Sequence, residues 1–419
     1  MYESNGPLNR KRKMNLRMIE ANSNDHAGRG RLIAVLLIIM MVFTASCSGR
    51  GKAEGQNAAS AEIADLISDV SADNAADFDF TEKAMEYLEY IGTELPDRML
   101  EGGKDHDAAR EWIVSELKKA GYSDDQISLQ DFSGEWLGGL TGTNIILTIE
   151  GEDPSKQIIV GGHYDGDGVG DNGSGTALLL ANAVGLQGVK PHYTVKIIFF
   201  DAEEEGCFGS EYNVEQMSDE EVDSTLYMVN IDSLAFGDYC NIYGGTYSEM
   251  DMYSDEPQTE APPATEAYTF AADMAERLGF KVLRTEDLDG YYAAHGTGPE
   301  IEAGTLYTNP WTPQNPAPAN SCAMSPATLP ASDHIFYMDR GIEYIYFEAT
   351  NWFASAEDDE YGLSYTGYLE TYDTTLGDQG MFMNTEFDTW ENLNGIFPGR
   401  AEAHFRLYSP LLSALILVR

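Results

Sequence analysis

Short apolar runs that alternate with amphipathic segments are the feature that most restricts how this 419-residue chain can fold. The runs are rich in Val, Ile and Phe, which is typical of strands that are buried on both faces of a sheet. Strands that alternate with helices predict a three-layer α/β sandwich around a mixed, largely parallel central sheet. The runs predicted to be strands are Asn144–Ile149, Ile158–Val160, Val195–Phe200, Leu226–Ile231 and Ile342–Phe347.

Apolar side chains recur every three or four residues in the segments around these runs, which predicts helices there. A final helical region is expected over about 388–416, and Pro410 should break or kink it, because proline lacks an amide hydrogen. Ten of the sixteen prolines lie between residues 244 and 330, which predicts a loop-rich insertion holding one helix and not a separate domain. The other predicted helices are Thr81–Leu95, Asp107–Ala120, Gly175–Val184 and Ala267–Leu278.

The N-terminal residues have the pattern of a targeting signal. Basic residues precede an apolar run at Leu32–Phe43 and then Thr44–Cys47, an arrangement typical of a bacterial lipoprotein signal peptide. The apolar run is shorter than the roughly 20 residues that span a bilayer. We expect a signal peptide over 1–46, a lipid on Cys47, a flexible tether over 47–77 and a folded domain over 78–419. An ordinary secretory signal or an uncleaved anchor would also place that domain outside the cytoplasm.

The charge balance and the cysteines narrow the possible partners. The chain has 25 Lys and Arg against 70 Asp and Glu, a formal net charge of −45. A surface this negative repels phosphate backbones, so we expect no nucleic-acid partner.

The four cysteines lack Cys-x-x-Cys spacing, which argues against a thiolate zinc finger. Cys240 and Cys322 could form a disulfide outside the cell, and Cys207 would then be a buried small apolar residue.

Polar side chains with the chemistry of a metal site stand close to the ends of the predicted strands. Ligands bind at the carboxyl ends of strands in open α/β sheets, so we expect these side chains to meet. Each has an ordinary interpretation by itself, such as a helix cap at Asp171 or a solvated acidic turn at 203–205. The set comprises His163 and Asp165, Asp171, Glu203 and Glu204, Asp232, and His334.

As an ordered set, these residues without Asp165 offer two imidazoles and three carboxylates, besides one carboxylate that could act as a base. Such a set suits two zinc ions that share one bridging carboxylate. Two divalent ions about 3.5–4 Å apart can activate water and polarise a carbonyl. A calcium-binding EF-hand loop is excluded, because Val169 and Thr176 stand where that loop requires an oxygen ligand and a glutamate.

These motifs resemble those of the M28 zinc aminopeptidases, co-catalytic metallopeptidases with the zinc-dependent exopeptidase fold. The resemblance implies that Asp171 bridges two zinc ions, that Glu203 is the general base and that Asp165 orients His163. It implies a full ligand set of His163, Asp171, Glu204, Asp232 and His334. Many members carry a histidine where this chain has Asn384. The matching segments are 162–165, 171–175, 202–210, 230–232 and 332–334, and the preceding helices and residues 384–389 extend the resemblance over roughly 81–416.

The function implied by the resemblance is a lipid-anchored, extracytoplasmic aminopeptidase that uses two zinc ions to cleave N-terminal bonds of peptide substrates. One alternative is a lipid-anchored peptide-binding protein that has lost catalysis, which would be expected to have a broken ligand set. Another alternative is glutaminyl-cyclase-like chemistry at one zinc ion. The sequence indicates no particular oligomeric state. The histidines predicted to be surface or core residues are His106, His192, His295 and His404.

Overall fold

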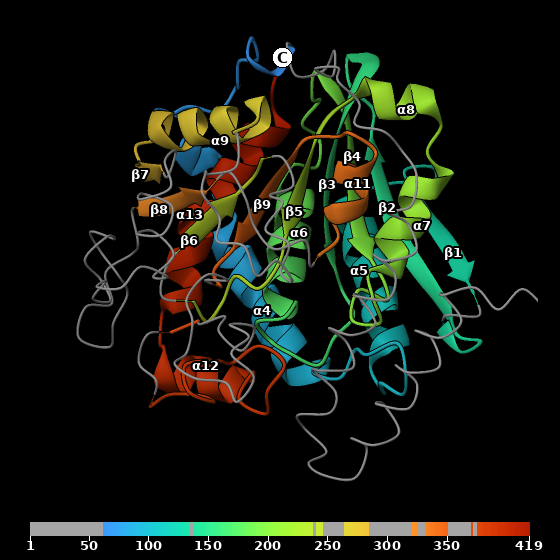
Figure 1. Cartoon of the computed structure of the whole chain (residues 1–419), viewed down its shortest axis with the longest axis vertical. Coiled ribbons are helices and arrows are strands. Elements are labelled where there is room, and N and C mark those ends of the chain that lie inside the picture. Colours follow the sequence, from blue (N-terminus) through green and yellow to red (C-terminus); the bar gives the residue numbers. More distant parts are fainter. Residues whose placement is uncertain are drawn as a thin grey trace, which may run out of the picture. The chain divides into compact units, whose positions relative to one another are not determined.

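One mixed sheet of nine strands organises the fold, in the order β1-β2-β4-β3-β5-β9-β6-β8-β7 (Figure 1). Strands β4, β3, β5 and β9 run parallel at its centre, and β1 and β2 form an antiparallel pair at one edge. The mixed, largely parallel sheet predicted from the sequence is therefore confirmed. The strands are β1 Ile127–Ser133, β2 Thr141–Ile149, β3 Asp153–His163, β4 Tyr193–Phe200, β5 Thr225–Ile231, β6 Cys240–Tyr243, β7 Lys281–Arg284, β8 Ser321–Ser325 and β9 Tyr344–Glu348.

This computed structural model describes residues 62–134, 137–237, 240–245, 264–284, 321–325, 332–350, 370–371 and 375–419. The predicted signal peptide, Cys47, the first part of the tether, His295 and much of the predicted insertion lie outside the described residues. The tether predicted up to residue 77 is wrong for its described part, because Ile63, Leu66 and Val70 are buried in the core and Ser68 pairs with Val418. Within the described ranges, no helix is both long and apolar enough to cross a bilayer.

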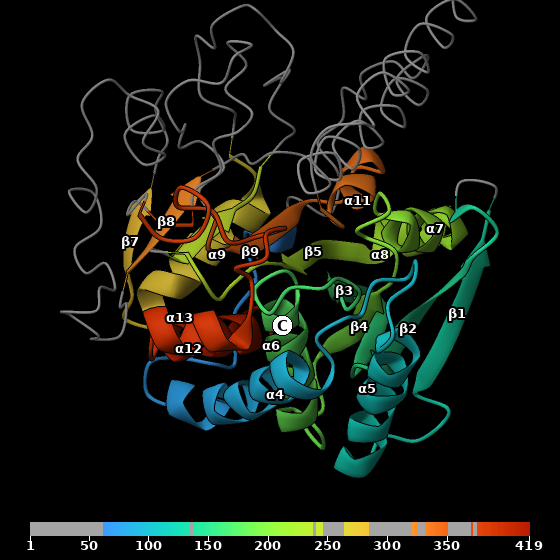
Figure 2. The ribbon, with the colours of Figure 1, turned by 90° about the horizontal axis from the view of Figure 1, so that it is seen from below.

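Helices cover both faces of the sheet and complete the three layers (Figure 2). On one face, one set of helices packs with the sheet into a large apolar cluster. On the other face, short helices pack over a smaller cluster built around Ile159, Ile198 and Met228. The first set is α4 Thr81–Glu94, α5 His106–Ala120, α6 Gly173–Gly185, α9 Glu266–Arg277, α12 Trp390–Ile396 and α13 Arg400–Ile416, preceded by the 3₁₀ turn η1 Ala75–Phe78; the second set is α7 Phe208–Gln216, α8 Asp219–Ser224 and α11 Ile335–Asp339.

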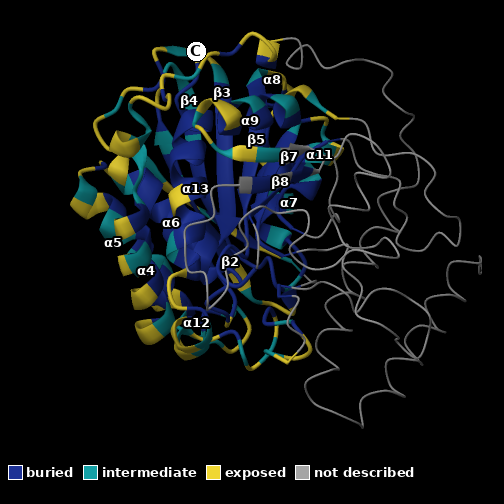
Figure 3. Ribbon diagram, turned by 90° about the vertical axis from the view of Figure 1, so that its left-hand side faces the viewer, coloured by how far each residue is buried: buried dark blue, intermediate teal, exposed yellow. Residues whose placement is uncertain are grey.

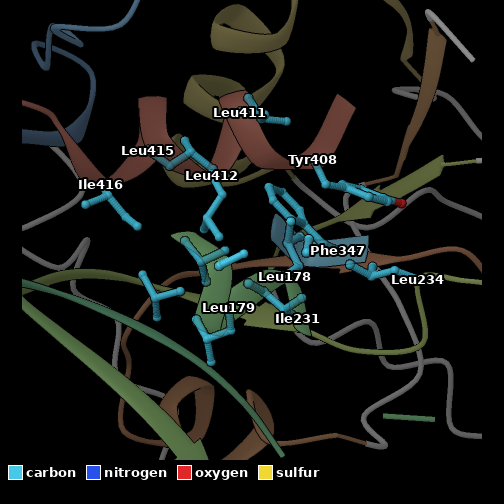
Figure 4. Packing of buried hydrophobic residues seen from close by; sticks show 14 of the residues in the cluster. Leu178, Leu179, Ile231, Leu234, Phe347, Tyr408, Leu411, Leu412, Leu415 and Ile416 are labelled. Carbon is cyan, nitrogen blue, oxygen red and sulfur yellow. The ribbon is translucent and has the colours of Figure 1, made fainter. Parts of the chain in front are cut away.

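Helix α6 lies at the centre of the core and begins beside the ends of the central strands. Its buried residues run almost without interruption along its length, so it is covered on all sides. Figure 4 shows Leu178 and Leu179 of α6 packed in one group with Ile231 and Phe347 of the sheet and Leu412 of α13, and the carboxyl-terminal halves of β3 and β4 are buried (Figure 3). This packing fixes the start of α6 relative to the strand ends.

The C-terminal region corrects one prediction. A break or a kink was predicted at Pro410; this proline lies inside α13 and the helix continues to Ile416, so the break does not occur. The chain instead leaves the helical conformation between α12 and α13, where Gly399 has a φ of 85°. A proline inside a helix costs about 3 kcal/mol, and each fully buried leucine contributes roughly 1.5–3 kcal/mol. Burial of Leu411, Leu412 and Leu415 beyond the proline therefore outweighs its cost.

The proline-rich segment contributes to the sheet as well as to loops. Its one predicted helix is present as α9, but β7 and β8 extend the sheet beyond β6 and were not predicted. Strands this short carry too little periodicity to be recognised in a sequence. Cys240 and Cys322 are directly opposed on β6 and β8, and both are buried free thiols. The disulfide considered from the sequence is therefore not formed in the structure.

Candidate metal centre

The candidate site lies at the carboxyl ends of three neighbouring strands. His163 is the last residue of β3, Glu203 and Glu204 occupy the turn after β4, and Asp232 directly follows β5. These strands are parallel and hydrogen-bonded to one another, so their ends meet at one edge of the sheet. Asp171 enters this edge from the loop before α6.

The side chain of His163 is the centre of the cluster. Its Nε2 atom lies 3.2 Å from Asp171 Oδ1, 3.3 Å from Asp232 Oδ1 and 3.9 Å from Glu203 Oε2. Two overlapping groups could each hold a metal ion: His163, Glu203 and Asp232, and His163, Asp171 and Glu204. The structure thus brings together five of the side chains that the sequence placed in the site.

The carboxylates of the cluster are buried close to one another. Each is at most 9% exposed. Burial and the charge of Asp232 raise the pKa of Asp171 to about 6, and burial raises the pKa of Glu203 and of Glu204 well above the usual range. A divalent cation would offset this repulsion, and one imidazole nitrogen with several carboxylate oxygens is a donor set that zinc accepts. The residues present therefore fit a zinc centre.

The start of α6 leaves the Asp171 carboxylate available to the site. Asn172, and not Asp171, caps the helix, because its side-chain oxygen accepts from the Gly175 N–H at 2.8 Å. The Asn172 amide also donates to the Ile231 carbonyl at 2.9 Å, which ties the helix start to the end of β5. The helix cap considered for this segment is therefore formed by Asn172.

Asp165 connects His163 to the acidic turn. Its carboxylate is fully buried and lies 3.5 Å from His163 Nδ1. The same carboxylate accepts the backbone N–H groups of Glu203 and Glu204, each at 3.2 Å. Asp165 therefore holds the turn after β4 in addition to contacting the imidazole, a second role that the sequence did not indicate.

Cys207 makes a contact with the candidate base. It is buried, as predicted, and its Sγ atom donates to Glu203 Oε1 at 3.2 Å. This contact could not be anticipated from the sequence, where Cys207 offered only a small apolar side chain. A thiol is a weak donor, so it restrains the carboxylate without neutralising it.

His334 lies outside both metal-binding groups. Its ring packs against Tyr344 and Tyr346, with centroid separations of 4.5 and 4.8 Å, and its Nδ1 atom is 3.5 Å from Asn230 Nδ2. Burial lowers the pKa of His334 to about 3, so the imidazole is neutral at physiological pH. The structure therefore does not gather His334 with the other predicted ligands.

Asn384 is the polar side chain that the structure places next to Asp171. Its Nδ2 atom donates to Asp171 Oδ2 at 3.5 Å, and its backbone is left-handed, with a φ of 56°. A left-handed φ is uncommon for a residue with a side chain, and asparagine tolerates it better than most. Position 384, where many M28 members carry a histidine, therefore lies at the candidate metal centre.

Three other histidines lie where the sequence predicted, in the core or at the surface. His106 is buried, with Nε2 2.8 Å from Asp201 Oδ1, and His404 is buried with Nδ1 2.6 Å from the Leu234 carbonyl. His192 is partly exposed beside Glu152. The Asp201 carboxylate also accepts from the Tyr164 hydroxyl at 2.9 Å, a buried network that the sequence analysis missed.

Comparison with known proteins supports the relationship inferred from the motifs. Residues 144–279 match the model of Peptidase family M28. Leupeptin-inactivating enzyme 1 of Streptomyces exfoliatus is 30% identical over 165 residues, covering 38% of this chain and 34% of that protein. Leucine aminopeptidase 2 of Arthroderma otae is 32% identical over 114 residues, covering 26% of this chain and 23% of that protein. The alkaline phosphatase isozyme conversion protein of Escherichia coli is 24% identical over 359 residues, covering 78% and 88%.

This chain matches peptidase family M28 over residues 144–279, which supports the resemblance drawn from its motifs. It spans about a quarter to a third of the length of the first two relatives. A zinc aminopeptidase from Bacillus subtilis has a similar structure, with 18% identity and a TM-score of 0.39 over 65% of this chain and 50% of that one. A Zn-dependent exopeptidase from Parabacteroides distasonis has 16% identity and a TM-score of 0.48 over 83% and 98%.

Proposed function

We propose that this protein is a zinc aminopeptidase that hydrolyses the N-terminal bond of peptides. The observation that carries the proposal is the position of His163 Nε2, which is within 3.9 Å of carboxylate oxygens from Asp171, Glu203 and Asp232. A buried imidazole among carboxylates at the ends of parallel strands is the arrangement expected of a metallohydrolase in family M28.

His163, Asp171, Glu204 and Asp232 would hold two zinc ions, and the resemblance drawn from the motifs implies that Asp171 is the carboxylate they share. Bound zinc would supply Lewis-acid chemistry that activates water and polarises the scissile carbonyl. Asp165 keeps His163 and the Glu203–Glu204 turn in place through its contacts with both. His334 is not included in this ligand set, because it lies outside both groups of possible ligands.

Glu203 would act as the general base. Burial raises its pKa, which makes it a stronger proton acceptor than an exposed carboxylate. Its Oε2 atom lies 3.9 Å from His163 Nε2, and the Cys207 thiol donates to its Oε1 atom. In this role Glu203 takes a proton from the attacking water and delivers it to the leaving amine.

A glutaminyl-cyclase-like reaction at one zinc ion is the second candidate. The observation that favours it is that His163 supplies the imidazole of both possible metal-binding groups in the described structure. With one imidazole between them, the two metal positions are unequal, and a site that retains a single zinc ion would suit cyclisation better than hydrolysis.

Substrates that differ only at the amino terminus separate these functions. The purified protein is expected to hydrolyse aminoacyl-anilides with a free amine and to leave the N-acetylated anilides intact, with activity lost to a chelator and restored by zinc. Cyclisation of peptides that begin with glutamine, without anilide hydrolysis, would contradict the aminopeptidase proposal and support the glutaminyl-cyclase-like function. No turnover of either substrate by zinc-loaded protein would leave a peptide-binding protein.

We further propose that Cys47 carries a lipid that anchors the protein outside the cytoplasm, on the strength of the basic, apolar and small-residue pattern of residues 1–47. Cys47→Ser is expected to abolish labelling by a radioactive fatty acid and to move the protein from the membrane fraction to the soluble fraction. The matched control is Ser48→Ala, which should change neither. Continued fatty-acid labelling of Cys47→Ser would rule out this anchor.

A further inference from the structure

The loop that joins His163 to Asp171 carries a proposed metal ligand at each end. His163 ends β3, and Asp171 stands two residues before the first residue of α6. The shape of the loop over 164–171 therefore sets the 3.2 Å separation between His163 Nε2 and Asp171 Oδ1. Loops of polar backbone are usually mobile, so a loop with this task needs partners for its own N–H and C=O groups.

Arg98 binds the carbonyl side of this loop. Its backbone N–H donates to Gly166 O at 2.8 Å, its Nε atom to Tyr164 O at 2.9 Å and its Nη2 atom to Gly168 O at 2.8 Å. Its remaining contact, from Nη1, is with Leu95 O at 2.9 Å. Every second carbonyl from 164 to 168 thus accepts a hydrogen bond from the same residue.

The guanidinium of Arg98 is a buried charge, 1% exposed. Burial lowers its pKa, and the carboxylates of Asp388, Asp165, Asp171 and Asp167 act in the opposite direction. An arginine side chain stays protonated in proteins, so a positive charge lies within reach of the acidic site. Two of the three side-chain hydrogen bonds go to carbonyl oxygens of the loop and the third goes to Leu95 O, so the guanidinium binds backbone carbonyls and not one carboxylate partner.

Asp388 binds the N–H side of the same loop. Its Oδ1 atom accepts from Val169 N at 2.8 Å and from Gly170 N at 2.6 Å, and its Oδ2 atom accepts from Asp171 N at 3.0 Å. The residue is 4% exposed. Burial raises the pKa of Asp388 to about 7, and the three backbone N–H groups act in the opposite direction because they favour the carboxylate. In its charged form this carboxylate is a strong local restraint, since charge-assisted hydrogen bonds are about twice as strong as neutral ones.

Glycine at position 168 makes this approach possible. A Cβ atom there would lie 2.3 Å from Asp388 Oδ2 and 2.5 Å from Asp171 O, which no side chain can satisfy without moving the loop. The close contact between the loop and Asp388 therefore depends on the absence of a side chain. Arg98 lies before α5 and Asp388 before α12, so segments from both ends of the domain converge on one loop.

We propose that Arg98 and Asp388 are positioning residues for the metal centre, which hold the 164–171 loop from opposite sides and so set the separation of His163 and Asp171. This inference rests on the proposed function for its consequence, the affinity for zinc. The restraint of the loop by Arg98 and Asp388 does not depend on the proposed function, because these hydrogen bonds form in the metal-free protein.

The proposal is tested by zinc affinity and by amide hydrogen exchange of residues 164–171 in the metal-free protein. Loss of a residue that orients a metal ligand typically costs 10–100-fold in metal affinity. Arg98→Met and Asp388→Asn are each expected to lower zinc affinity, measured by competition with a chromogenic chelator, by about 10–100-fold. Both should also speed exchange in the loop. Asp388→Asn keeps one acceptor oxygen, so it should act mainly on the Asp171 N–H.

Two further variants separate geometry from charge and from general loss of packing. Arg98→Lys keeps the charge but gathers its donors on one nitrogen, so it should fall between Arg98→Met and the wild type. Arg400→Met removes another buried arginine, which donates to Phe236 O and stacks on Phe397. We expect it to leave zinc affinity and loop exchange unchanged.

The outcomes are distinct. Wild-type affinity and exchange in folded Arg98→Met and Asp388→Asn would overturn the proposal, as would an equal loss in Arg400→Met. Full recovery in Arg98→Lys would show that the charge and not the hydrogen-bond geometry matters, and would also overturn it. If the wild-type protein binds no zinc, the proposed function fails, while faster exchange in the two metal-free variants would still support the restraint.

Discussion

Replacement of Glu203 by glutamine is expected to lower kcat by about 10²–10⁴-fold, the range that a positioned general base contributes. Glutamine keeps the shape of the side chain and its contact with the Cys207 thiol, but it cannot accept a proton. Zinc content should stay at the wild-type value, because His163, Asp171, Glu204 and Asp232 remain. The measurement is kcat on an aminoacyl-anilide together with elemental analysis of the same preparation.

The matched control is Glu205→Gln, the same change two residues further along the acidic turn. Glu205 belongs to neither metal-binding group, and its Oε1 atom accepts from the Glu101 N–H at 3.3 Å. We expect this variant to keep kcat within a few fold of the wild type. A fall in kcat of less than tenfold in Glu203→Gln would assign the base elsewhere, and a parallel loss of zinc would make Glu203 a ligand.

Replacement of His163 by alanine is expected to abolish tight zinc binding. His163 belongs to both possible metal-binding groups, so its loss leaves carboxylates alone at the centre. Zinc at 100 times its dissociation constant stabilises a protein by about 2.7 kcal/mol, and this stabilisation should be absent from the variant. The measurements are zinc content after dialysis and the change in Tm on adding zinc.

His404→Ala is the matched control, because His404 is equally buried but bonds to the Leu234 carbonyl. It should lower Tm while keeping both the zinc content and the rise in Tm with zinc. Wild-type zinc binding in His163→Ala would contradict the proposed centre. The comparison with His334→Ala is also informative, since a large loss of zinc there would mean that His334 leaves its packed position to bind metal.

The largely parallel character of the central sheet and the polar residues at its strand ends could be predicted from the sequence for one physical reason. A strand buried on both faces is an unbroken apolar run, and the residue after it must lie at the carboxyl edge of a parallel sheet. His163, Glu203 and Asp232 each follow such a run, so their meeting required only that β3, β4 and β5 be neighbours. The structure places these strands side by side.

The short and polar elements could not be predicted in the same way. Strands β7 and β8 carry no distinctive period, and their place in the sheet depends on pairing with β6 and with each other. At Pro410 the sequence did carry a strong local signal for a helix break. The burial of the apolar residues beyond the proline outweighed that signal, and the helix continues.

The sequence by itself determined the α/β class, the strand ends that carry polar residues and the resemblance to family M28, because these depend on periodicity and on the order of residue types along the chain. Only the tertiary structure decided which distant side chains meet at the centre. It sets Asn384 beside Asp171, leaves His334 between two tyrosines and brings Arg98 and Asp388 to one loop. The physical reason is that such contacts depend on how separate segments pack, and packing between distant segments leaves no period in the sequence.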